Sequence, residues 1–433
     1  MLARCLGEGR VASRYWGLTL RKIIAAASLF ALAACGFNGT DPDGDDGSAD
    51  KTANATTENL ADTMASHDGG DAASDVPDIP DSQPRPIMQA QVVLDRAGFG
   101  PGVIDGKMGL STENALEGFQ EANGLETSGK LDEPTKAKLA QWEKIPATRL
   151  VRIPADWADL PYVRTPDEPE DQAKLKELGY QNLDEKLAER FHTTVEVLKM
   201  LNPGGRPAGM KEGQGAGATP ASTASASPSA SGSPSPTPSA SGSEGAPDGT
   251  PLPSTFAAGQ LIRVPNIGGD RIAPGAVDDQ AWQQTLQTLG VGTEQPKVAR
   301  VVVSKAGGTL KAYDQGDKLV ALFTVTSGSS EDPLPLGDWK INVVSRNPPF
   351  NYNPDLFWDA KPGDKKAKLP AGPNSPVGVV WIDLSKEHYG IHGTPEPQNI
   401  GRTQSHGCVR LTNWDAARLA QMIDTKTKVE FVA

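Results

Sequence analysis

The chain has 433 residues and a formal net charge of -12, with 42 basic and 54 acidic side chains. This balance excludes nucleic acid as a partner, because binding to phosphates requires clustered Lys and Arg. The 46 Gly, the 36 Pro and a hydrophobic fraction of only 37% predict two or three folded domains joined by long unstructured stretches.

The N-terminus has the pattern of an export signal over residues 1–34. Basic residues precede an apolar run, 23–34, which is too short to span a bilayer because a span needs about 20 residues. The run ends in Leu-Ala-Ala-Cys and resembles a bacterial lipobox, which implies that Cys35 is lipidated and anchors an exported, periplasm-facing protein in a membrane. Gly36 after this cysteine favours the outer membrane over the inner one. The alternative is an ordinary signal peptide in which Cys35 is incidental.

Two stretches have too few large apolar residues to form a core. Residues 35–85 are rich in Asp, Ser, Ala, Thr and Gly, and residues 204–253 are rich in Pro, Ser and Ala. Neither stretch can bury enough surface to offset the entropy lost on ordering. We predict a flexible tether in the first and an extended insert in the second.

Residues 86–145 have apolar side chains at helical intervals, separated by turn glycines. Asp105-Gly106, Phe119-Gln120, Gly124-Leu125 and Gly129 follow one another in an order that resembles the type one peptidoglycan-binding domain. The resemblance implies a small three-helix module that binds the cell wall.

Residues 146–267 contain two separated pieces of another pattern. A helical piece ends at Leu201-Asn202-Pro203, and a strand-like piece, 258–265, follows the insert 204–253. Together they resemble the two ends of a LysM wall-binding module, although no opening strand is evident. A plain helix followed by an unrelated strand is the alternative. An insert of this length is tolerable, since the entropy of loop closure grows only logarithmically.

Residues 296–433 have the character of a β domain. Segments 298–303, 309–313, 319–325, 338–344 and 378–383 are rich in β-branched and aromatic residues, with Gly, Pro and Asp between them. A helix is predicted from Asn413 to Ile423, with Thr412 or Asn413 as its cap, and a last strand over 428–432. The pattern predicts a mainly-β sandwich or barrel with one or two helices.

The run from Ser405 to Arg410 reads Ser-His-Gly-Cys-Val-Arg, and His392-Gly393 stands upstream. Cys5 and Cys35 lie in or at the end of the signal segment, so Cys408 is the thiol expected to stay free after export. A thiol needs a base to become nucleophilic, and His392 can return to the same pocket across a loop. The carbonyl of Gly393 is placed to orient that imidazole.

There are two alternative interpretations of these histidines and this cysteine. His406 is the alternative base, because it is closer to Cys408 in sequence. A metal site formed by His392, His406 and Cys408 would quench the thiolate and has no evident fourth ligand, so we expect no metal and no cofactor. The other histidines, at 67, 192 and 388, are expected to be ordinary core or surface residues.

These motifs, with Asp332 to Gly337 and Asn374 to Gly378, resemble the L,D-transpeptidase (YkuD-like) family over nearly all of residues 297–433. The resemblance implies a β-sandwich-like catalytic fold with short helices. It makes Cys408 the nucleophile and His392 the general acid and base. The remaining expected site residues shape the pocket, form an oxyanion hole from backbone amides, or contact substrate: Gly393, Thr394, Ser405, His406, Gly407 and Arg410. For Arg410, holding the loop and meeting a substrate carboxylate are both open.

The sequence therefore predicts an enzyme whose substrate is peptidoglycan. Cys408 would attack a tetrapeptide stem before its terminal D-alanine and pass the acyl group to an amine in cell-wall cross-linking. Transfer to water would make it an L,D-carboxypeptidase or a cross-link hydrolase instead. A non-catalytic peptidoglycan-binding lipoprotein is the alternative of a different class.

Overall fold

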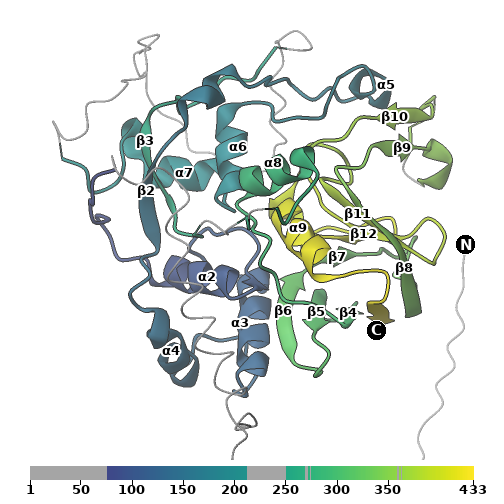
Figure 1. Cartoon of the computed structure of the whole chain (residues 1–433), viewed down its shortest axis with the longest axis horizontal. Coiled ribbons are helices and arrows are strands. Elements are labelled where there is room, and N and C mark those ends of the chain that lie inside the picture. The colour runs from purple at the N-terminus through teal and green to yellow at the C-terminus, as the bar shows by residue number, and fades with distance from the viewer. Residues whose placement is uncertain (1–75, 212–249, 269–271, 274, 358–359, 362) are drawn as a thin grey trace, which may run out of the picture. The chain divides into compact units, whose positions relative to one another are not determined.

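The computed structural model describes residues 76–211, 250–268, 272–273, 275–357, 360–361 and 363–433 (Figure 1). The predicted signal peptide, Cys35, nearly all of the tether and most of the insert lie outside these residues. Within the described ranges, no helix has both the length and the apolarity that a bilayer crossing requires. All described residues belong to one compact unit.

The first described segment is helical, as its pattern predicts. Its elements are α2 (Pro86–Arg96), β1 (Phe99–Gly100), α3 (Leu110–Ala122), α4 (Glu133–Leu139) and a short 3-10 helix η2 (Ala140–Trp142). Phe119 packs edge-on against Phe99 and Trp142 in the core. Gln120, its neighbour in the motif, binds the following loop by donating to Lys130 O and Thr135 Oγ1. In the Phe-Gln pair, the phenylalanine thus packs in the core of this module and the glutamine fixes the loop that follows α3.

The second segment forms a β-α-α-β unit. Strand β2 (Thr148–Arg152) pairs antiparallel with β3 (Leu261–Pro265), and α6 (Leu183–Arg190) and α7 (Val195–Leu201) lie between them in sequence. The structure therefore supplies the opening strand that the sequence did not reveal. Asn202 joins the two ends by accepting from the Arg263 N–H and donating to its carbonyl. The LysM resemblance of this unit stays a prediction. Short helices also occur at η3 (Ala155–Asp159), α5 (Pro169–Gln172) and η4 (Pro203–Gly205).

The C-terminal segment is a mainly-β fold, as predicted. Its strands form a sheet in the order β1-β6-β5-β4-β14-β8-β11-β12-β13-β7. Their bounds are β4 Arg300–Ser304, β5 Thr309–Tyr313, β6 Leu319–Thr324, β7 Thr326–Ser327, β8 Gly337–Arg346, β11 Val380–Leu384, β12 Gly390–His392, β13 Val409–Arg410 and β14 Lys428–Val432. A separate hairpin pairs β9 (Phe350–Tyr352) with β10 (Ala367–Leu369), and the 3-10 helices are η5 (Pro354–Leu356) and η6 (Pro397–Asn399).

Two helices accompany this sheet. Helix α9 (Asn413–Met422) begins after Thr412, whose hydroxyl accepts from the Asp415 N–H, and it contacts β11 and β12 (Figure 1). Helix α8 (Gln280–Leu289) occupies a stretch for which the sequence predicted no element. Its apolar side buries Trp282, Leu286 and Leu289 in the same core as the sheet.

The first strand of the sheet comes from the helical segment. Strand β1 pairs in parallel with β6, so Phe99 lies opposite Leu322. Sequence patterns did not indicate this, because a two-residue strand has no measurable alternation. The helical segment and the C-terminal sheet are therefore joined by backbone pairing as well as by side chains.

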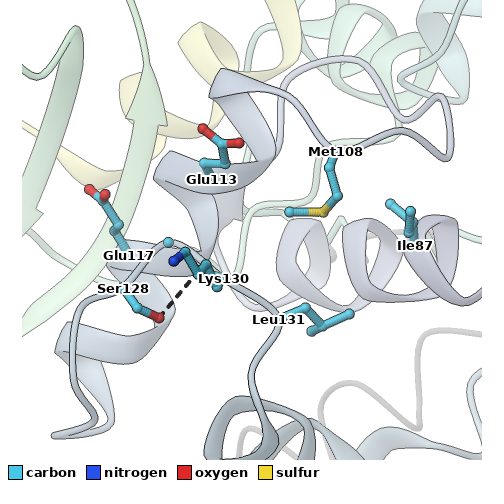
Figure 2. A pocket seen from close by; sticks show the side chains of 8 residues that line it. Ile87, Met108, Glu113, Glu117, Ser128, Lys130 and Leu131 are labelled. Atoms are coloured by element: carbon cyan, nitrogen blue, oxygen red, sulfur yellow. Dashed lines mark hydrogen bonds between the residues drawn. The ribbon is translucent and has the colours of Figure 1, made fainter.

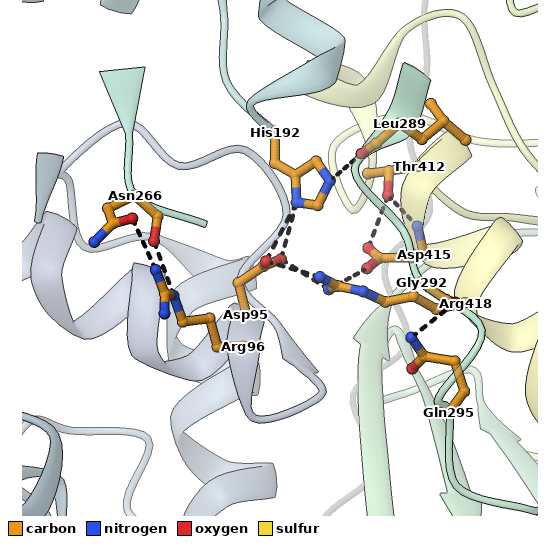
Figure 3. Close-up of polar contacts among 10 residues, drawn as sticks. All are labelled: Asp95, Arg96, His192, Asn266, Leu289, Gly292, Gln295, Thr412, Asp415 and Arg418. Carbon is orange, nitrogen blue, oxygen red and sulfur yellow. Dashed lines mark hydrogen bonds and ion pairs between the residues drawn. The ribbon is translucent and has the colours of Figure 1, made fainter. Parts of the chain in front are cut away.

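A buried polar cluster lies at the same junction (Figure 3). Asp95 of α2 accepts two hydrogen bonds of 2.9 Å from the Arg418 guanidinium of α9 and contacts His192 Nδ1 at 3.2 Å. Burial alone would raise the pKa of Asp95, but the Arg418 charge and the His192 contact outweigh it and hold that pKa well below its usual range. His192 also stacks on Trp414, with ring centroids 4.7 Å apart. Asp95 thus connects three segments that are distant in sequence, through its ion pair with Arg418 and its contact with His192.

Candidate active site

His392 is the last residue of β12, and Cys408 directly precedes β13, the strand beside it. Strand β13 runs parallel to β12, with Ile391 opposite Val409 and His392 opposite Arg410. Ile391 and Val409 are buried in the core of the sheet. Because side chains alternate along a strand, His392 and Arg410 project from the other face. Cys408 lies in the bend directly before β13, so the register places the thiol next to the strand that pairs with the one carrying the imidazole.

The thiol lies beside the turn that leads into β12. Cys408 Sγ donates a weak hydrogen bond of 3.7 Å to the His388 carbonyl, and the residue is partly exposed. Burial of the sulfur raises the pKa of the Cys408 thiol above its ordinary value, although the Gly390 N–H and the Arg410 charge act in the opposite direction. The resting thiol therefore keeps its proton at neutral pH.

The imidazole of His392 is held in one orientation. Its Nδ1 donates to the Gly393 carbonyl at 2.7 Å, and its ring stacks on Trp381 with centroids 5.5 Å apart. Burial, together with the Arg410 charge, lowers the pKa of His392 to about 3, against the opposing effect of the Gly393 hydrogen bond. The ring is therefore neutral, and with the proton on Nδ1 the lone pair stays on Nε2.

The turn before Cys408 is fixed by Ser405 and Gly407. Ser405 Oγ donates to the Cys408 carbonyl at 2.6 Å and accepts from the Gly328 N–H at 2.7 Å. Gly407 has φ +88°, and a Cβ at this position would lie 2.3 Å from Cε1 of Tyr389. Only glycine satisfies both the left-handed backbone and the close tyrosine ring. The peptide planes on either side of the thiol are thereby oriented.

The other expected site residues lie around this turn. The His406 ring meets the Phe357 ring edge-on at 5.0 Å. Arg410 Nη1 lies 3.5 Å from the Gln404 carbonyl, which is consistent with holding the loop. Thr394 is buried, and its hydroxyl accepts from the Glu396 N–H at 3.3 Å. The structure thus places Gly393 and Thr394 directly after β12, and the run from Ser405 to Cys408 directly before β13; Cys35 lies outside the described residues.

Comparisons with known proteins identify the family of the C-terminal segment. Residues 298–431 match the family model described as "L,D-transpeptidase catalytic domain". The "Putative L,D-transpeptidase YkuD" of Bacillus licheniformis is 30% identical over 165 residues, which are 38% of this chain and 79% of that protein. The chain belongs to the L,D-transpeptidase family. The family predicted from the sequence is therefore confirmed.

Further matches cover smaller shares. Residues 84–139 match the model described as "Putative peptidoglycan binding domain", which confirms the predicted wall-binding module. The "Putative L,D-transpeptidase YkuD" of Bacillus subtilis is 47% identical over 57 residues, 13% of this chain and 35% of that protein. L,D-transpeptidase 3 of Mycobacterium tuberculosis, solved with a faropenem-derived adduct, is 17% identical, with a TM-score of 0.27, over 32% of this chain and 61% of that one. These relatives extend beyond the part that the chain matches.

Sequence reasoning missed three residues that shape the site in this member of the family. Trp381 stacks on His392, Tyr389 covers Gly407, and Asn413 packs against the backbone of Gly393. The sequence indicates Asn413 only as a possible helix cap. The glycines themselves were the available signal, since a glycine in a motif often marks a close neighbour.

The described residues contain no group of three or more His, Cys, Asp and Glu side chains placed to hold a metal ion. Two cavities lie away from the thiol. One of about 470 Å³ lies in the helical segment, between Glu113 and Glu117 on one side and Ile87 and Met108 on the other (Figure 2). The second, of about 390 Å³, lies between Tyr162, Tyr180 and helix α8.

Proposed function

We propose that this chain is a peptidoglycan L,D-transpeptidase with Cys408 as nucleophile and His392 as general base and acid. The observation that carries the proposal is the aligned pairing of β12 and β13. In it His392, a neutral imidazole with its Nδ1–H bound to Gly393, pairs with Arg410, and Cys408 directly precedes the strand that carries Arg410. Membership of the family and the wall-binding module support the same reading.

The resting pair is a thiol beside a neutral imidazole, so proton transfer accompanies attack. Nε2 of His392 takes the thiol proton as sulfur bonds to the carbonyl carbon between the third stem residue and the terminal D-alanine. The carbon–nitrogen bond breaks, the proton passes to the leaving amine, and a thioester to Cys408 remains. An acceptor amine then attacks the thioester, loses its proton to His392 and releases the thiol.

Backbone donors complete the proposed site. Gly407 and Cys408 are the amides expected to meet the developing oxyanion, each donor contributing about 3 kcal/mol in the transition state. The Ser405 hydroxyl supports that role because it closes this turn, donating to the Cys408 carbonyl and accepting from the Gly328 N–H.

The test uses purified tetrapeptide muropeptides and product analysis by mass spectrometry. Cys408→Ala should abolish release of D-alanine while leaving binding to sacculi intact, and His392→Ala should slow it by about 10²- to 10⁴-fold. Activity retained in Cys408→Ala would overturn the proposal. Cross-linked dimers indicate an amine acceptor, tripeptides alone indicate a hydrolase, and binding without thiol acylation by a carbapenem indicates a non-catalytic lipoprotein.

We also propose that the protein is exported and anchored in a membrane by a lipid on Cys35, facing the periplasm, with the outer membrane as its expected site. The apolar run before Leu-Ala-Ala-Cys supports this reading. Metabolic labelling with a fatty acid should mark the wild-type protein and not a Cys35→Ser variant. Equal labelling of both would refute the anchor.

A further inference from the structure

A buried carboxyl group outside the matched catalytic segment reaches the first residue of α9. Glu189, near the end of α6, accepts a hydrogen bond of 2.7 Å at Oε1 from Asn413 Nδ2. Asn413 is fully buried, and Glu189 is 8% exposed. The other carboxyl oxygen of Glu189 contacts the Tyr180 hydroxyl. A contact between residues 224 positions apart thus joins the unit of β2, α6, α7 and β3 to the segment that matches the catalytic model.

The opposite side of the Asn413 amide lies against the main chain of the active site. Its Oδ1 accepts from the Val379 N–H at 3.2 Å. A Cβ built on Gly378 would lie 1.9 Å from this oxygen, and one built on Gly393 would lie 2.2 Å from it. Gly393 is the residue whose carbonyl accepts the Nδ1–H of His392. The amide is therefore packed against the peptide that orients the proposed base.

Glu189 is one of three groups that set which way this amide faces, with the Val379 N–H and the Pro373 carbonyl. The two ends of an Asn amide have nearly the same shape, but only the NH₂ end can donate to a carboxylate. With Glu189 in place, Nδ2 faces Oε1 and Oδ1 faces the Val379 N–H. Without it, Nδ2 keeps only its 3.1 Å bond to the Pro373 carbonyl. Burial raises the pKa of Glu189 to about 7, and a proton on the oxygen beside Tyr180 leaves Oε1 an acceptor.

We propose that Glu189 is a positioning residue for His392, acting through Asn413 on the Gly393 peptide. A helix outside the family's catalytic segment then holds the acceptor that orients the imidazole. The inference rests on the proposed role of His392 and goes beyond it, because it assigns part of the active-site geometry to a helix that lies before the catalytic segment in the chain. The expected defect lies in the acylation step rather than in substrate binding.

The experiment compares variants of the full chain by the rate at which a carbapenem acylates Cys408, followed by intact mass, and by kcat and KM on tetrapeptide stems. Glu189→Met keeps the volume but removes the acceptor, and it should slow acylation by about 10- to 100-fold, as small misplacements of catalytic groups do, with KM within about twofold. Glu189→Gln keeps an acceptor oxygen and should stay within about threefold of wild type.

Asp184→Asn is the matched control on the same helix. Asp184 is as buried as Glu189, but its carboxylate accepts from the Thr255 and Phe256 N–H groups, away from Asn413. It should lower the midpoint of thermal unfolding without slowing acylation. If Glu189→Met does not fold, Glu189→Asp, which withdraws the oxygen by one methylene, replaces it with the same expected loss.

The proposal is overturned if the folded Met or Asp variant acylates at the wild-type rate. It is also overturned if Asp184→Asn slows acylation as much as Glu189→Met does, or if Glu189→Gln acylates as slowly as Glu189→Met. A wild-type protein that neither acylates nor releases D-alanine would instead overturn the proposed function, so the two failures are distinguishable.

Discussion

Gly407 offers a sharp test of how the turn before the thiol is built. Its φ of +88° and the Tyr389 ring both exclude a side chain, since a Cβ would lie 2.3 Å from Cε1 and 3.1 Å from Cζ of that ring. Gly124 is the matched control, because it has φ +65° with nothing within 4 Å of its built Cβ. An alanine would therefore be strained by the positive φ at both positions, but it would clash with a neighbouring side chain only at Gly407.

The expected costs follow from these two terms. An L-residue in the left-handed region costs about 1–2 kcal/mol, which should be the whole effect of Gly124→Ala. Overpacking adds about 1–3 kcal/mol, so Gly407→Ala should lose about 2–5 kcal/mol of unfolding free energy. The ring or the turn must also shift, and a shift of about 1 Å beside the nucleophile should slow acylation by about 100-fold.

Urea unfolding measures the first effect and carbapenem acylation the second. In a Tyr389→Ala background, Gly407→Ala should cost no more than Gly124→Ala does, because the clash is gone. Equal costs for the two glycine variants in the wild-type background would refute the reasoning. So would a penalty at Gly407 that survives removal of the tyrosine ring.

Two other predictions follow from the charges. The rate of Cys408 alkylation by iodoacetamide should keep rising past pH 9, because the pKa of the thiol is raised. Protonation of His392 should not affect this rate above about pH 4. An inflection of the rate below pH 8 would contradict a neutral thiol beside a neutral imidazole. Asp95→Asn should lower the unfolding free energy at pH 7 by about 3–5 kcal/mol, because Arg418 stays charged and buried. Since the pKa of Asp95 is depressed when folded, its contribution is present above about pH 4 and is lost as the pH falls further; urea unfolding from pH 7 to pH 3 should therefore show less acid destabilisation in the variant than in wild type.

The chemistry was accessible from the sequence because it is local. Ser405 to Cys408 form one continuous turn, and the residue types state their roles: a hydroxyl that binds two backbone groups, a glycine at positive φ and a thiol. The longer strands were predictable for a similar reason. Strand β4 alternates buried and partly exposed residues along its whole length, which a pattern of period two reports directly.

The short strands that hold the site were not predictable. Strands β12 and β13 have three and two residues, too few for any alternation to show. Strand β1 and the opening strand β2 owe their place to partners more than 100 positions away. Their pairing depends on the register of the finished sheet, not on their own composition.

What the sequence by itself determined was the family, the motif that contains the proposed nucleophile, and the strands long enough to have a period. Only the tertiary structure decided how the segments before the catalytic sheet pack against helix α9. The contacts are those of Asp95 with Arg418 and of Glu189 with Asn413. Each pair is a buried polar contact between segments more than 200 residues apart. Such contacts arise from the complementarity of two folded surfaces, and single residues of common types give no periodic signal of them.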